Sequence, residues 1–233
     1  MQRHENQQPG DCPNFRSTKM GLSPYQILLA GTAILIAVAS AFLAPTEATM
    51  GDAQRIVYIH VAMAWRGLLG YLVMAAAGAV YLIGRNPAWD HWARAAAELG
   101  WLCCGLTLIT GSLWAHAAWN TWWTWDPRLT ASLILWVMYW GCLLVRGGPD
   151  DPQRRARLGA ILAIVGVIDV PLVVMATRWF RGIHPTSPAM EPSMRAVLLM
   201  HLVGFTALFI VLLVLRRTQL HIEHLLAEWD LSC

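Results

Sequence analysis

Residues 195–215 read RAVLLMHLVGFTALFIVLLVL, and the only formal charge in this run is that of Arg195 at its first position. An α-helix needs about 20 apolar residues to cross the hydrocarbon core of a bilayer, so the run predicts a membrane-spanning helix. Because backbone polar groups must be satisfied within a segment at membrane depth, helices are the expected form of such runs. Five similar runs come earlier in the chain, at roughly 24–44, 61–84, 95–114, 130–146 and 158–177. We therefore predict an all-α polytopic membrane protein with six transmembrane helices.

The composition of the whole chain agrees with this prediction. Hydrophobic residues make up 57% of the 233 positions and charged residues only 13%, whereas a soluble domain carries about 25% charged residues. The net charge of +3 comes from basic residues spread over short connections, so nothing indicates binding to nucleic acid. The chain has no Cys-x-x-Cys-His motif, which excludes a c-type cytochrome.

The basic residues predict the orientation of the chain. Most of the 17 Lys and Arg residues lie in the two tails and in the even-numbered connections, so the positive-inside rule places both termini in the cytoplasm. The first, third and fifth connections then face the opposite side of the membrane. The expected organisation is a disordered cytoplasmic tail at 1–23, a six-helix domain at 24–215 and a cytoplasmic amphipathic tail at 216–233.

Two features near the chain ends refine this organisation. The small residues at 39–41 would suit a signal-peptide cleavage site, but the long polar leader favours an uncleaved first helix. Near the C-terminus, apolar residues at helical spacing predict a short amphipathic helix on the cytoplasmic face, with a partner-docking helix as the alternative. These apolar residues are Ile222, Leu225, Leu226 and Trp229.

The segment 114–130, WAHAAWNTWWTWDPRLT, is expected to form the third, outward-facing loop and holds five of the 13 tryptophans. An aromatic belt at the membrane interface would explain one or two of them. A slot for a planar apolar molecule would explain the density better, because indole rings offer broad apolar faces. The five tryptophans are Trp114, Trp119, Trp122, Trp123 and Trp125.

Parity brings a histidine from each flanking connection to the same side as these tryptophans. Either His60 or His184 alone is explained by interfacial packing. Together they provide the two imidazoles that a bis-histidyl haem iron requires. A zinc site is a weaker alternative, because it would need further ligands and only His116 is at hand.

Charged residues beside the tryptophans fit the same hypothesis. The Asp126-Pro127 pair predicts a cap at the start of the fourth helix, which leaves room for a second role. Arg55 and Arg128 could pair with haem propionates through planar bidentate contacts. Asp169 lies inside a span beside Pro171, where a carboxylate has either a functional role or a structural one at a kink.

The segment 114–130 resembles the tryptophan-rich WWD signature of haem-handling proteins in cytochrome c biogenesis, and most of all the haem exporter protein C (CcmC) family. The likeness extends over most of the chain, through residues 54–61, 166–171 and 192–195. The chain departs from the family pattern around the signature, with Ala115, His116, Asn120 and Pro127, and at Asp169.

The resemblance implies a function. It implies non-covalent binding of haem b between His60 and His184, with the WWD segment as a platform, in the bacterial inner membrane. It also implies delivery to the periplasmic haem chaperone CcmE, together with the small subunit CcmD and the ATP-binding cassette components CcmA and CcmB. On this view the protein is a haem carrier without catalytic residues.

Two rival functions remain. A haem lyase that attaches haem to an apocytochrome is disfavoured by chain length, and His201, the one extra intramembrane histidine, is expected to pack against a neighbouring helix. A small-solute transporter would be expected to show internal repeats, which the sequence lacks.

Overall fold

The computed structural model describes residues 23–148, 151–184 and 190–232, so the expected N-terminal tail lies almost wholly outside it. Six helices are long and apolar enough to cross a membrane, the fifth formed by two consecutive elements, which confirms the predicted fold class. The helices in the described part are α1 (Pro24–Leu43), α2 (Gln54–Gly84), α3 (Pro87–Trp119), α4 (Pro127–Gly147), α5 (Pro152–Gly166), α6 (Asp169–Trp179) and α7 (Pro192–Ser232).

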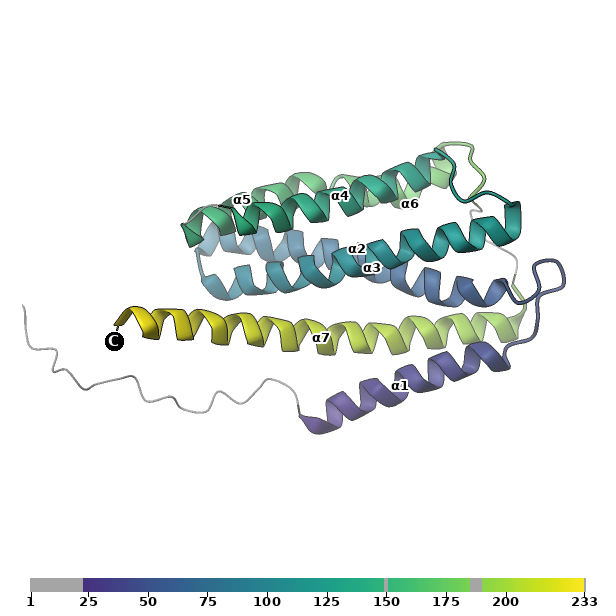
Figure 1. The fold of residues 1–233 in the computed structure, drawn as a ribbon, viewed down its shortest axis with the longest axis horizontal. Helices are drawn as coiled ribbons and strands as arrows, with labels where there is room; N and C mark the ends of the chain where they lie inside the picture. The colour runs from purple at the N-terminus through teal and green to yellow at the C-terminus, as the bar shows by residue number, and fades with distance from the viewer. Residues whose placement is uncertain (1–22, 149–150, 185–189, 233) are drawn as a thin grey trace, which may run out of the picture.

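The helices lie side by side in an elongated bundle (Figure 1). The central pair, α2 and α3, packs along its length, with α4, α5 and α6 on one side and α7 on the other. Helix α1 packs mainly on α7 at the edge of the bundle. The connections α1–α2, α3–α4 and α6–α7 gather at one end, as the parity of six spans requires.

Proline and polar caps define where several helices begin. Helices α3, α4 and α5 each start with proline, whose missing N–H would have no partner in the first turn. The preceding residue caps the helix in each case: Asn86, Asp126 and Asp151 each accept a hydrogen bond from a backbone N–H two residues later. The predicted cap at Asp126 is confirmed.

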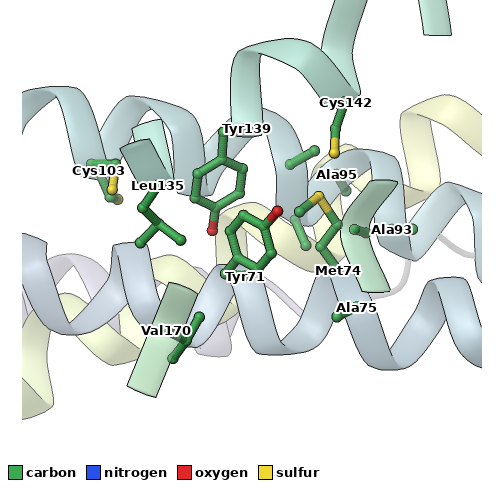
Figure 2. Packing of buried hydrophobic residues seen from close by; sticks show 14 of the residues in the cluster. Tyr71, Met74, Ala75, Ala93, Ala95, Cys103, Leu135, Tyr139, Cys142 and Val170 are labelled. Carbon is green, nitrogen blue, oxygen red and sulfur yellow. The ribbon is translucent and has the colours of Figure 1, made fainter. Parts of the chain in front are cut away.

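Aromatic side chains form the centre of the core. Tyr71 and Tyr139 pack edge to face with ring centroids 4.7 Å apart (Figure 2). The Tyr139 hydroxyl donates a hydrogen bond of 2.7 Å to the carbonyl oxygen of Gly67 and so joins α4 to α2. Because both rings are fully buried, these contacts help to fix the register of the central helices.

A second buried contact joins α2 to α7. Arg66 is almost fully buried and donates from Nη2 to the carbonyl oxygens of His201 (3.3 Å) and Leu202 (2.9 Å). His201 is fully buried and its ring lies 5.5 Å from that of Tyr58, so its predicted packing against a neighbouring helix is confirmed.

The fifth span is broken between α5 and α6. Pro171 has no N–H to donate, and its ring would clash with the carbonyl of Val167 in a regular helix, which explains a break at 167–168. Asp169 is the first residue of α6, directly after this break, and it is buried.

The C-terminal tail forms a continuation of α7, which corrects the expected separate interfacial helix. No glycine or proline occurs after Gly204, so no residue interrupts the helix before Ser232. The extension also packs on α3, where the Arg216 guanidinium lies 2.5 Å from the Glu98 carboxylate. Of the predicted apolar face, Ile222 and Leu225 are partly buried.

Candidate functional site

A cavity of about 80 Å³ lies between α2, α3, α4 and α6, and residues of the α3–α4 and α6–α7 connections contribute to its lining. This volume is smaller than that of most small-molecule sites, about 300–1,000 Å³. Six of the residues predicted from the sequence line it: His60, Trp114, Trp119, Trp123, Arg128 and His184. Residues far apart in the chain thus meet around one apolar space.

His60 lies in the second turn of α2, and its ring orientation is set by α3. Its Nδ1 lies 3.1 Å from the carbonyl oxygen of Thr107 and 3.2 Å from the Thr110 hydroxyl. A carbonyl can only accept a hydrogen bond, so this contact requires the proton on Nδ1. The other nitrogen, Nε2, then carries the lone pair that a metal ligand needs.

Gly111 gives the imidazole of His60 the space it occupies. A Cβ at this position would lie 2.9 Å from Cε1 and 3.4 Å from Nδ1 of His60. Contacts between carbon atoms are normally about 3.5–4.0 Å, so a side chain here would displace the ring. The α3 helix therefore both bonds the ring at Nδ1 and leaves a recess for it.

His184 reaches the cavity from the connection that follows α6. Its backbone N–H donates to Asp126 Oδ2 over 3.4 Å, and Asp126 Oδ1 caps α4 by accepting from the Arg128 N–H at 2.8 Å. Gly182 packs closely against the same carboxylate. The second histidine is therefore attached to the start of the helix that follows the tryptophan segment.

The tryptophans divide between the cavity and the surface. Trp114 and Trp119 meet edge to face with centroids 4.7 Å apart, and Trp123 completes the aromatic wall. Trp122 and Trp125 do not line the cavity and are 55% and 75% exposed. The segment supplies three cavity-lining indoles and two indoles on its outside.

His116 also lies outside the cavity. Its ring stacks on Trp122, with centroids 4.1 Å apart and planes inclined by 8°. It is therefore not placed beside His60 and His184, where a third zinc ligand would have to be.

The two predicted arginines have different surroundings. Arg128 lines the cavity and lies 3.5 Å from the Thr177 hydroxyl on α6. Among the described residues of the lining it is the one permanently charged side chain. Arg55 instead pairs with Asp52 at 2.9 Å and donates to the carbonyl oxygen of Ala41, so it holds the α1–α2 connection.

The helices extend further into the site than the sequence suggested. Residues 114–119 form the end of α3 and 127–130 the start of α4, so only 120–126 connects them instead of the whole expected loop 114–130. Asn120 ends α3 in a left-handed conformation, with φ of 53°. Asparagine tolerates this conformation well, which is a local signal for a helix end there.

Four residues with a part in the site were not predicted from the sequence: Thr107, Thr110, Gly111 and Gly182. Small residues at positions 107, 111 and 112 could have indicated a face of α3 where another helix side chain comes close. No local pattern pairs Gly182 with Asp126, because 55 residues separate them.

Comparison with known proteins gives consistent matches. The family model described as Heme exporter protein C matches residues 7–229. Heme exporter protein C of Bradyrhizobium diazoefficiens is 37% identical over 194 residues, which cover 79% of this chain and 74% of the relative. The protein of that name from Paracoccus denitrificans is 31% identical over 222 residues, covering 91% and 92%. That from Escherichia coli K12 is 32% identical over 181 residues, covering 76% and 74%.

Proposed function

The chain belongs to the haem exporter protein C family, and we propose that it binds haem b non-covalently between His60 and His184 and delivers it to a periplasmic haem chaperone for cytochrome c maturation. The observation that carries this proposal is the shared cavity. Two histidines from distant parts of the chain line one apolar space together with three tryptophans. Two imidazoles can coordinate haem iron axially, and apolar walls can bury the macrocycle.

The described residues fit the chemistry of haem. His60 has Nδ1 engaged by α3, so Nε2 is the nitrogen available to iron. The indoles of Trp114, Trp119 and Trp123 provide apolar faces that can bury a macrocycle. Arg128 provides the guanidinium that a propionate carboxylate would require in such a site.

This chemistry is that of a carrier. Histidine coordination and indole contacts are reversible and change no covalent bond, so the proposed role is binding and presentation of haem without catalysis. The proposed location is the bacterial inner membrane, with both termini cytoplasmic and the cavity on the periplasmic side. The proposed partners are the chaperone CcmE, the small subunit CcmD and the ATP-binding cassette components CcmA and CcmB.

Haem binding is tested with the full-length chain purified in detergent and titrated with haem. We expect the absorption spectrum of low-spin iron with two histidine ligands. His60→Ala and His184→Ala should each convert it to a five-coordinate, high-spin spectrum. His116→Ala is the matched control, because His116 lies near the site but outside the cavity. An unchanged spectrum in both ligand variants would refute the ligand assignment.

Delivery is tested in cells that lack the chromosomal copy of this protein. Expression of the wild-type chain should restore the covalent adduct between haem and the periplasmic chaperone, which is detected on gels by haem staining. The His60→Ala variant should fail to restore it at equal protein levels. Normal amounts of adduct in cells without the chain would exclude the delivery role.

A further inference from the structure

The carboxylate of Asp126 connects two parts of the site that are far apart in the chain. Oδ1 accepts the Arg128 N–H at 2.8 Å and thereby caps α4. Oδ2 accepts the His184 N–H at 3.4 Å. Asp126 is 8% exposed and does not line the cavity. Its two oxygen atoms therefore serve the protein backbone.

Gly182 makes close contact with the same carboxylate. A Cβ at this position would lie 1.8 Å from Oδ2 and 2.6 Å from Cγ of Asp126. Real Cβ atoms do not approach other atoms so closely, so any side chain here would push the connection away. Among the described glycines only Gly51 has a positive φ, so at Gly182 lack of space is what requires glycine.

We infer that Asp126 and Gly182 form a clip that positions His184 as a haem ligand, and that Asp126 acts through this clip without touching haem. The inference rests on the proposed function. It deepens that function by giving Asp126 a positioning role: its carboxylate holds the backbone of His184, the second proposed ligand. Loss of the clip lets the connection move and separates the His184 imidazole from the iron, while His60 stays in place on α2.

The clip must be distinguished from an ordinary helix cap. Asp151 provides the comparison, because it caps α5 in front of Pro152 and accepts from the Gln153 N–H at 3.0 Å. It follows α4 in the chain, whereas Asp126 precedes α4, so the two caps lie at opposite ends of that helix. Equivalent substitutions at Asp126 and Asp151 therefore disturb two similar caps, of which one also holds His184.

The first experiment uses the haem-free, full-length chain in lipid nanodiscs. Hydrogen exchange of the His184 amide is measured by mass spectrometry in the wild type, Asp126→Ser and Gly182→Ala. Both variants should exchange this amide at least about threefold faster, because its hydrogen bond to the carboxylate is weakened or lost. Asp151→Ser and Gly141→Ala are the controls and should match the wild type, because a Cβ at Gly141 meets nothing within 4 Å.

The second experiment adds haem and records the absorption spectrum. Asp126→Ser and Gly182→Ala should show a five-coordinate component that the controls lack. Added imidazole should restore the low-spin spectrum, because it fills the axial position that His184 has left. Asp126→Asn separates the two roles: its amide oxygen still caps α4, but its nitrogen cannot accept the His184 N–H. We expect wild-type thermal stability and an altered spectrum in this variant.

The outcomes separate this inference from the proposed function. Wild-type exchange at His184 in both clip variants overturns the clip, whatever happens with haem. A changed spectrum that imidazole fails to restore indicates a deformed cavity and also overturns the positioning role. If the His60→Ala and His184→Ala variants keep the wild-type spectrum, the proposed function fails, while exchange in the haem-free protein still tests the contact itself.

Discussion

Replacement of Gly111 by alanine is the most direct test of how α3 positions the first histidine. The added Cβ would lie 2.9 Å from Cε1 of His60, whereas an ordinary contact needs about 3.5 Å or more. The ring must therefore move by roughly 0.6 Å, while the Thr107 carbonyl holds Nδ1 at 3.1 Å. Ligand constellations tolerate displacements of about 0.5 Å, so this shift is large enough to disturb coordination.

The expected cost follows from overpacking. An extra methyl group in a packed site costs about 1–3 kcal/mol. Haem binding must return the displaced ring to its position against this methyl group, so the dissociation constant for haem should rise roughly 5- to 150-fold. The assay is a haem titration of the purified chain, followed by absorption. Gly141→Ala is the matched control, since it adds the same methyl group to a helix where a Cβ meets no neighbour.

A double-mutant cycle makes this test specific to His60. In a His60→Ala background the ring that the new methyl group would displace is absent, so Gly111→Ala should have little further effect. Unchanged affinity in the single variant would refute the reasoning. An equal loss in both backgrounds would show that the methyl group disturbs the cavity by some route other than the imidazole.

Three further predictions concern the walls of the cavity and the bundle around it. Trp123→Ala should weaken haem binding in a titration, whereas Trp122→Ala should leave the dissociation constant unchanged, because of these two indoles only that of Trp123 lines the cavity. An equal loss of haem affinity in both variants would contradict this prediction. Arg128→Gln should weaken binding of haem more than binding of its dimethyl ester, which has no carboxylates; the same loss for both ligands would exclude a propionate contact. Asp90→Asn should lower the thermal stability of the haem-free protein by about 3–5 kcal/mol, since it leaves Arg146 buried without the carboxylate that lies 2.5 Å away. A melting temperature equal to that of the wild type would show that this ion pair is dispensable.

Much of the fold could be predicted because membrane insertion depends on local sequence. A run such as 195–215 needs no partner to be recognised as a span, and parity alone places three connections at one end. The Asp126-Pro127 pair likewise identified the start of α4 correctly. The predicted end of the last helix was wrong. Hydropathy marks where the membrane-spanning part ends, but it does not reveal the packing on α3 that accompanies the continuation of α7.

The sequence predicted several of the residues that line the cavity, but not the contacts that support them. His60 and His184 stand out because histidine is rare in apolar surroundings, and both do line the cavity. Gly111 and Gly182 carry no such signal, since their importance lies in the atoms of other segments that approach them. Arg55 was chosen for its charge, but Asp52, three residues earlier in the chain, pairs with it.

The tryptophan segment presents its indoles in two different surroundings. Trp114 and Trp119 are five residues apart on a helix, and a further change of direction after Asn120 brings Trp123 to the same wall. The residues on either side of this wall, Trp122 and Trp125, then face away from the cavity. Cavity-lining and exposed indoles thus occur together in one short segment. Asp126 ends it by accepting hydrogen bonds from the Arg128 and His184 N–H groups, so a single carboxylate joins the tryptophan segment, the next helix and the second histidine.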